Sequence, residues 1–171
     1  MKVFLRTLLA LILLTAGMSG LGHSEPFGPP KGAVVLTVTG QIAAKNTETG
    51  LALDAEQLAT LPQTSFTTTT TWTDGPQTFQ GVLLKDLIAA LGATGSTISL
   101  RAANDYSIIM PMADVKEDGP LLAYLMNGKP MSLRDKGPIW MVYPYDLNEA
   151  FRTEETYSRS IWQLVLIDFG A

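Results

Sequence analysis

Residues 81–92, with the sequence GVLLKDLIAALG, contain the clearest helix signal in the chain. Its large apolar side chains recur at positions i, i+3, i+4 and i+7, the spacing of one helical face. Gly92 suits the left-handed position that ends many helices. We therefore expect a helix over residues 81–92 that buries one face. The residues of that face are Leu84, Leu87, Ile88 and Leu91.

The chain on both sides of this helix is rich in β-branched and aromatic residues, which favour short strands. Asp54 suits the cap of a short helix that Pro62 follows. After the helix, residues 121–126 fit either a buried strand or a short helix, and residues 148–157 fit a short helix. The strands expected lie at 33–42, 51–53, 65–73, 97–102, 106–112, 138–143 and 161–167.

This order of elements predicts the fold class. Many short strands, few helices and no regular alternation of strand and helix are typical of an α+β domain dominated by strands. We expect mixed or barrel-like sheets with a few short helices, in a single domain over residues 25–171.

The first 24 residues have the pattern of a secretory signal peptide. Lys2 and Arg6 precede an uncharged apolar run at 7–17, and Gly22 and Ser24 suit the positions before a cleavage site. An uncleaved membrane anchor is the alternative, but a span needs about 20 apolar residues. We expect a periplasmic or secreted protein with no membrane span after cleavage.

Cleavage would leave little of the usual catalytic chemistry. It removes His23, the only histidine, and the chain contains no cysteine. Serine–histidine and cysteine–histidine catalysis are then excluded, as is zinc bound through nitrogen or sulfur. Ten basic residues would face sixteen acidic ones, a net charge of −6. Such a balance gives no support for a nucleic-acid partner.

Four segments place aromatic, arginine and carboxylate side chains where strands are expected to end. Each has an ordinary interpretation as a turn or a packed ring, but together they suit a flat, nitrogen-rich ligand. Aromatic faces stack on such a ring, and carboxylates accept from its N–H groups. The candidate binding residues are Trp72, Arg101, Asn104, Asp105, Tyr106, Tyr143, Tyr145, Arg159 and Trp162.

Four stretches, in order along the chain, carry a resemblance: FQGVLLKDLI at 79–88, ANDYS at 103–107, LAYLMNGKPM at 122–131 and GPIWMVYP at 137–144. The chain resembles the molybdopterin-binding domain of the sulfite oxidase superfamily over residues 33–169. The resemblance implies that fold and a pterin ligand.

One departure from the family bears on activity. Its enzymes hold molybdenum through a cysteine thiolate in the segment before the helix, and here residues 66–72 read FTTTTTW. A hydroxyl is a poor partner for that soft metal centre. The chain is more similar to short, exported, cysteine-free members, some of which report pterin levels to a membrane-bound signalling partner. The resemblance thus implies a non-catalytic sensor of a reduced pterin, molybdopterin-like or tetrahydropterin, without metal.

The roles expected within such a site follow from residue type and position. Trp72 would border the pterin ring, and the arginines would pair with ligand oxygens. Asp105 and Tyr106 would bind the polar edges, and Tyr143 and Tyr145 would line the mouth. The implied partner is a membrane-anchored cyclic-di-GMP enzyme or sensor kinase. The alternatives are a molybdopterin-dependent oxidoreductase with an atypical, cysteine-free site and an exported scaffold with an empty pocket.

Overall fold

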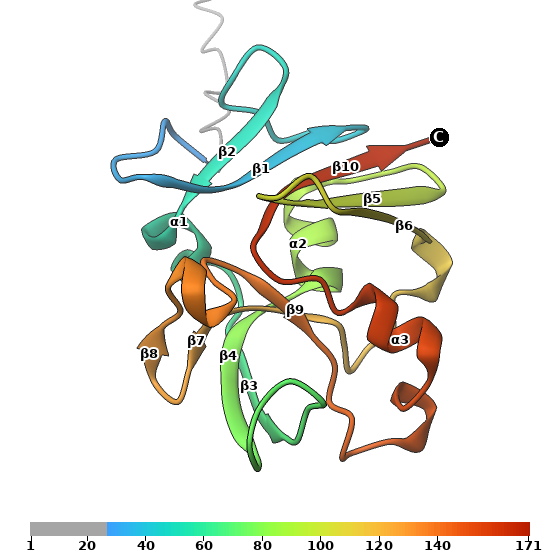
Figure 1. Cartoon of the computed structure of the whole chain (residues 1–171). Helices are drawn as coiled ribbons and strands as arrows, with labels where there is room; N and C mark the ends of the chain where they lie inside the picture. The colour runs from blue at the N-terminus through green and yellow to red at the C-terminus, as the bar shows by residue number, and fades with distance from the viewer. Residues whose placement is uncertain (1–26) are drawn as a thin grey trace, which may run out of the picture.

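The structure, a computed structural model, describes residues 27–171, so the predicted signal peptide lies outside the described residues. Over this range the chain forms two five-stranded sheets and three short α-helices (Figure 1). The prediction of a strand-dominated α+β fold is confirmed. No helix in residues 27–171 is long and apolar enough to cross a membrane.

The first sheet has the order β2-β1-β10-β5-β6 and is mixed. Strands β1 and β10 run parallel, and every other neighbouring pair is antiparallel. The first and last strands of the described chain therefore lie side by side, which closes the domain. The strands are β1 (Val34–Gly40), β2 (Gly50–Asp54), β5 (Thr97–Ala102), β6 (Ser107–Pro111) and β10 (Leu164–Gly170).

The second sheet has the order β3-β4-β7-β8. Strand β8 pairs with the end of β7, and β9 pairs with its beginning, residues 121–123. All its pairs are antiparallel. Residues 121–126, which fitted a strand or a helix, form the strand β7. The strands are β3 (Thr64–Thr68), β4 (Gln77–Leu83), β7 (Leu121–Met126), β8 (Lys129–Pro130) and β9 (Trp140–Val142).

The helix predicted over residues 81–92 begins three residues later than expected. Residues Gly81–Leu83 end strand β4, and α2 spans Leu84–Leu91. The ladder with β7 satisfies the backbone there, and a Cβ on Gly81 would come within 2.0 Å of the Leu122 carbonyl oxygen. The predicted stop is confirmed, because Gly92 adopts the left-handed conformation with φ of 56°. Figure 1 shows α2 between the two sheets.

The short helix α1 (Ala55–Thr60) is capped by Asp54, as predicted. The Asp54 carboxylate accepts from the backbone N–H of Gln57, and the Gln57 side chain accepts from the backbone N–H of Asp54. The same carboxylate accepts from the backbone N–H groups of Lys31 and Gly32. These backbone donors lower the pKa of Asp54 and tie the segment before β1 to the domain.

Strand β3 is shorter than the predicted strand over residues 65–73. It ends at Thr68 because the next threonines bond to other groups. The Thr69 backbone N–H and hydroxyl both donate to Asp146, and the Thr70 hydroxyl bonds to that of Thr73. We call residues 69–76, which connect β3 to β4, the tryptophan loop because they include Trp72.

The end of the chain also departs from the prediction. Residues 148–157 form a single 3₁₀ turn (Glu149–Phe151) followed by α3 (Glu154–Arg159), because Thr153 caps a new helix. Strand β10 begins at Leu164, after a positive φ of 53° at Gln163. The residues between α3 and β10 are therefore free to line a cavity rather than join the sheet.

Candidate functional site

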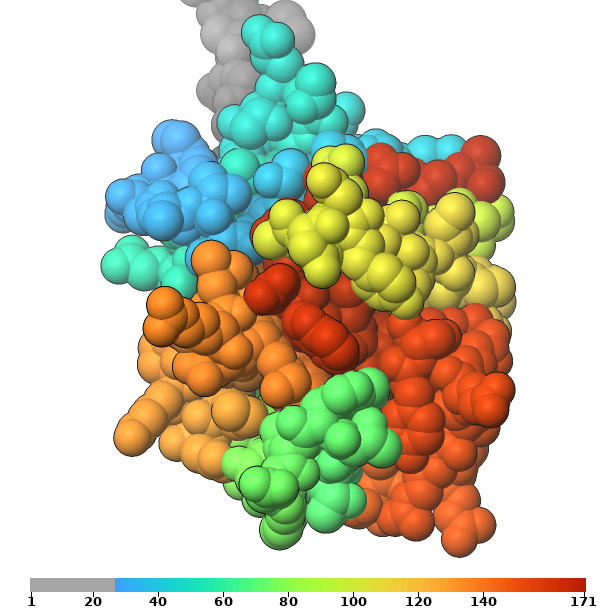
Figure 2. Space-filling model, in the orientation of Figure 1, coloured from blue at the N-terminus to red at the C-terminus, as the bar shows by residue number. Residues whose placement is uncertain are grey.

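A cavity of about 280 Å³ lies where the tryptophan loop, the turn between β5 and β6, and the segment from α3 to β10 meet. Figure 2 shows residues near the C-terminus (red) in a hollow between the β5–β6 turn (yellow) and the tryptophan loop (green). We call it the aromatic cavity. It is lined by Trp72, Ala102, Asn104, Tyr106, Tyr157, Ser158, Ser160, Ile161 and Trp162.

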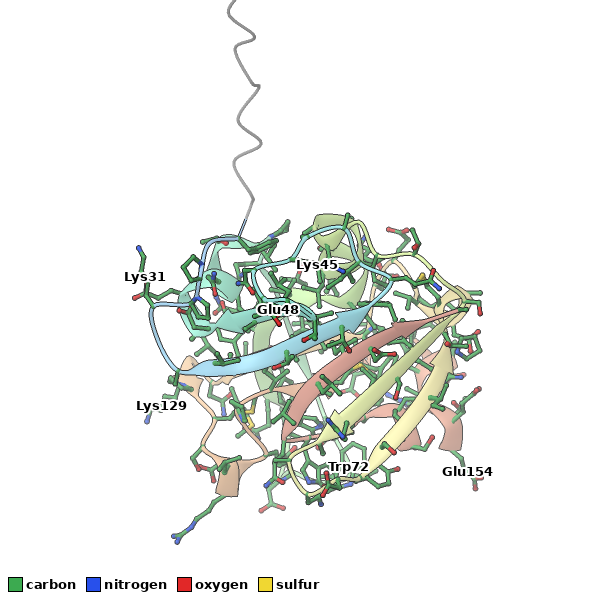
Figure 3. The ribbon with its side chains drawn as sticks, turned by 90° about the horizontal axis from the view of Figure 1, so that it is seen from above. Lys31, Lys45, Glu48, Trp72, Lys129 and Glu154 are labelled. Atoms are coloured by element: carbon green, nitrogen blue, oxygen red, sulfur yellow. The ribbon has the colours of Figure 1, made fainter. Side chains whose placement is uncertain are left out.

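Trp72 is the residue around which the aromatic cavity is built. Its ring lies edge-on to three other rings, with centroids 5.9 Å from Trp140, 6.0 Å from Tyr157 and 5.7 Å from Trp162. Edge-to-face contacts at these distances fix ring orientation. Figure 3 labels Trp72 near the ends of β5 and β6. Trp140 is fully buried, so the cluster anchors Trp72 to the core of the second sheet.

The tryptophan loop is held in place by Asp146. This carboxylate accepts the Thr69 backbone N–H at 2.5 Å and the Thr69 hydroxyl at 2.8 Å, and it pairs with Arg152 at 3.0 Å. The backbone donor is the main reason that the pKa of Asp146 is lowered. The carboxylate is therefore charged at neutral pH and binds the loop in that form.

The polar groups that line the aromatic cavity are all neutral. Asn104 accepts from the Tyr106 backbone N–H through Oδ1, which leaves its Nδ2 without a partner in the described part of the chain. Ser158 donates to a carbonyl oxygen of α3 and can still accept, whereas the buried Ser160 hydroxyl bonds to both the Thr156 carbonyl oxygen and the Tyr145 hydroxyl. An amide and a serine hydroxyl beside four aromatic rings suit an uncharged planar ligand that both donates and accepts hydrogen bonds.

The structure brings four of the nine predicted residues together in this cavity: Trp72, Asn104, Tyr106 and Trp162. Tyr106 and Trp162 are 51% and 37% exposed and form its rim. Tyr157 and Ser158 also line the cavity but were not among the predicted residues. They belong to the stretch YSRSIW at 157–162, which places aromatic and hydroxyl side chains together, but the prediction included only Arg159 and Trp162 from it.

Two predicted residues, Tyr143 and Arg159, line a second cavity of about 510 Å³. Helix α3 supplies residues to both cavities, with Tyr157 in the first and Arg159 in the second. Arg159 Nη2 pairs with Asp114 at 2.8 Å and with Glu155 at 2.5 Å. Both carboxylates belong to this chain, so the positive charge of Arg159 is already neutralised without a ligand.

The other three predicted residues line neither cavity. Tyr145 is 2% exposed and its hydroxyl bonds to Ser160 Oγ at 2.5 Å, which places it in the core behind α3. Arg101 lies exposed on β5, opposite Ser107. Asp105 occupies the turn after β5 with φ of 66° and is also exposed.

A molybdenum centre of the kind described for the sulfite oxidase superfamily does not fit the donors present. Its expected ligand position falls in residues 66–72, where the chain has threonines and no thiolate. The hydroxyls of Thr69 and Thr70 are engaged by Asp146 and Thr73.

The comparisons with known proteins agree on the fold. The model of the oxidoreductase molybdopterin binding domain family matches residues 33–147. Among solved structures, the sulfane dehydrogenase SoxCD from Paracoccus pantotrophus is similar, with a TM-score of 0.57 and 20% sequence identity. The match covers 79% of this chain but only 37% of that one. No curated protein matches the sequence.

Proposed function

This chain belongs to the oxidoreductase molybdopterin binding domain family, and on that premise we propose that it is a non-catalytic, exported protein that binds a reduced pterin without metal. The observation that carries the proposal is the aromatic cavity around Trp72, with its neutral lining. Its volume of about 280 Å³ lies at the small end of ligand sites, which suits a bicyclic ring with a short substituent.

The recognition follows from the side chains that line this cavity. Trp72, Tyr157 and Trp162 offer aromatic surface to a planar ring. Asn104 can donate through Nδ2 to a ring nitrogen or carbonyl, and Ser158 can accept from an amino group. Reduced pterins carry all of these groups on one ring system. A metal would need a further donor set, and the threonines of the tryptophan loop do not supply it.

The proposed role as a sensor rests on where the cavity lies. Tyr106 and Trp162 are both exposed at its rim, so a partner that contacts them would meet a different surface when the ligand is bound. The signal-peptide pattern of residues 1–24 supports export to the periplasm. A membrane-anchored signalling protein is the partner that would transmit the ligand-bound state of this surface across the membrane.

Binding is tested with purified protein and 6-methyltetrahydropterin under anaerobic conditions, by tryptophan fluorescence and calorimetry. We expect quenching, and we expect Trp72→Ala to weaken the affinity about tenfold or more, because stacking of a base-like ring on an aromatic side chain contributes roughly 1–3 kcal/mol. Phe66→Ala is the matched control. Phe66 lies on β3 and packs on Phe79, outside the cavity lining, so its removal should leave the affinity unchanged.

Two results would contradict the proposal. Equal affinity in the wild type and Trp72→Ala would remove the aromatic cavity as the binding site. Stoichiometric molybdenum in protein isolated from its native cells, together with turnover, would instead support the oxidoreductase alternative.

A further inference from the structure

The first sheet has two edge strands, β2 and β6, and the chain closes only the edge of β2. Asn46 Nδ2 donates to the Ala52 carbonyl oxygen at 2.8 Å, and the Ala52 N–H donates to Asn46 Oδ1 at 2.8 Å. Gly50 exchanges a similar pair of bonds with the Thr47 hydroxyl, at 2.9 and 3.0 Å. The backbone groups of Gly50 and Ala52 that point away from β1 are therefore satisfied within the chain.

The hydrogen bonds between β5 and β6 show which backbone groups of β6 point outward. The Ala102 N–H donates to the Tyr106 carbonyl oxygen at one end of this pair of strands, and the Met112 N–H donates to the Ser96 carbonyl oxygen at the other. Bonded and non-bonded pairs alternate in an antiparallel ladder. The even-numbered residues of β6 therefore bond to β5, and the odd-numbered residues point their N–H and C=O groups away from it.

The outward residues of β6 are Ser107, Ile109 and Pro111. The backbone N–H and C=O groups of Ser107 and Ile109 have no partner within residues 27–171. Ile109 is 72% exposed, and the side chains of Ser107 and Pro111 are exposed as well. Natural edge strands are commonly protected by charged residues, and β6 has none. This edge is thus open to a further strand until Pro111, which has no N–H, ends it.

We propose that an extended segment of a partner protein adds to the first sheet beside β6, through main-chain hydrogen bonds to Ser107 and Ile109. The side chains on the solvent-facing side select the segment. Ile109 presents an apolar side chain there. Arg101 lies opposite Ser107 on β5, is exposed, and forms no ion pair within residues 27–171. A segment with an acidic and an apolar residue two positions apart would meet both side chains.

A second copy of this chain fits the open edge less well than such a segment. Antiparallel pairing of two β6 strands about Ile109 places Ser107 opposite Pro111, so the Ser107 carbonyl finds no N–H in either copy. Both copies would also carry the same net negative charge. The identity of the partner rests on the proposed sensor role. Tyr106, at the rim of the aromatic cavity, directly precedes β6, so the signalling partner would contact both.

The test follows amide hydrogen exchange in the ¹⁵N-labelled protein, without pterin, as the peptide KTEVIVTK with blocked ends is added. Exchange at Ser107 and Ile109 should slow about tenfold or more at saturation, because both N–H groups become hydrogen-bonded. Exchange at Ile108 and Met110, which already bond to β5, should stay unchanged. The matched control is the same peptide N-methylated at its glutamate and isoleucine, which keeps the side chains but cannot donate to β6.

Two variants locate the contact. Ile109→Pro should abolish peptide binding and keep the fold, because the Ile109 N–H makes no bond to β5 and proline is tolerated at such edge positions. Arg101→Gln should weaken binding several-fold, because it removes the cation that faces the acidic residue. Lys45→Gln is the matched control, since Lys45 is exposed on the loop beside the opposite edge of the sheet (Figure 3).

The proposal is overturned if the peptide leaves exchange at Ser107 and Ile109 unchanged, or if the N-methylated peptide acts equally. Slowing that depends on protein concentration without peptide would assign the edge to a second copy and overturn it as well. Pterin quenching is measured on the same samples. Quenching without peptide binding refutes only the strand addition, and peptide binding without quenching refutes only the pterin proposal.

Discussion

Two tyrosines that stand two positions apart show how much one hydrogen bond matters at the scale of single residues. Tyr143 and Tyr145 are both buried, and their ring centroids lie 6.3 Å apart. Tyr145 bonds to Ser160 Oγ, whereas the hydroxyl of Tyr143 has no partner in the described chain. Tyr145 therefore fixes α3 to the core through its hydroxyl, whereas Tyr143 is held by the packing of its ring against Phe151.

The two tyrosines should therefore respond differently to loss of the hydroxyl. Tyr145→Phe should lower the free energy of unfolding by about 1 kcal/mol, because a satisfied buried hydrogen bond is removed. Tyr143→Phe should leave it unchanged or raise it, since no bond is lost and an unpaired polar group disappears. Urea unfolding of both variants, without added ligand, measures the difference. Equal destabilisation of the two would show that Tyr143 has a partner after all.

At the scale of elements, the tryptophan loop is positioned by a residue far from it in sequence. Asp146 follows β9 and the loop follows β3, yet Thr69 donates to this carboxylate twice. Arg152 pairs with the same carboxylate. The loop that carries Trp72 is thus attached to the segment that leads into α3, and both sides of the aromatic cavity are held together.

This attachment predicts a pH dependence. The pKa of Asp146 is lowered from its ordinary value of 3.8, mainly by the Thr69 backbone donor. A lowered value means that the contribution to stability is present above pH 3.8 and is lost as the pH falls through the folded-state value. The fluorescence of Trp72 and its neighbours should therefore be constant from pH 7 to about 5 and change only in stronger acid.

Replacing the carboxylate should mimic that acid state at neutral pH. Asp146→Asn should speed amide exchange at residues 69–72 and weaken pterin binding several-fold, because the charge-assisted bonds are lost. Asp74→Asn, in the same loop, is the control, since no hydrogen bond of its carboxylate is found in the described chain. If Asp146→Asn left the acid-induced change in fluorescence as it is in the wild type, that change would belong to another titrating group.

At the scale of the whole molecule, the aromatic cavity exists only because the two sheets meet. The first sheet contributes the β5–β6 turn, the second contributes the tryptophan loop, and α3 closes the side. In Figure 1 α3 lies beside the ends of both sheets. A bound ring would touch all three, so occupancy would change a surface that no single element forms.

This surface is where we expect the signalling partner to bind. In cells that supply reduced pterins, the protein should co-purify with membranes, and Tyr106→Ala should reduce its recovery, because Tyr106 is 51% exposed at the cavity rim. Val34→Ala is the control, because Val34 is equally exposed on β1, outside the cavity lining. Recovery that does not depend on Tyr106 or on pterin supply would contradict the sensor role.

The sequence by itself determined the local elements. Helical spacing gave α2 and its stop at Gly92, the capping pattern gave α1, and β-branched runs gave most strands, because these depend on neighbours a few residues apart. The resemblance to the sulfite oxidase superfamily, and not a local pattern, implied that Trp72 lies at the expected ligand position. Where a long-range partner competes, local patterns failed: Asp146 ended β3 at Thr68, and the ladder with β7 kept Gly81 in a strand.

Only the tertiary structure decided which chemical groups share a site. Nothing in the spacing of Tyr143, Tyr145 and Trp162 shows that one lines the second cavity, one is buried and one forms the rim of the aromatic cavity. Those assignments depend on how α3 packs beside two sheets whose strands are distant in sequence (Figure 1). Contacts of that kind arise from the packing of the whole chain, so they cannot be predicted from residue type and order alone.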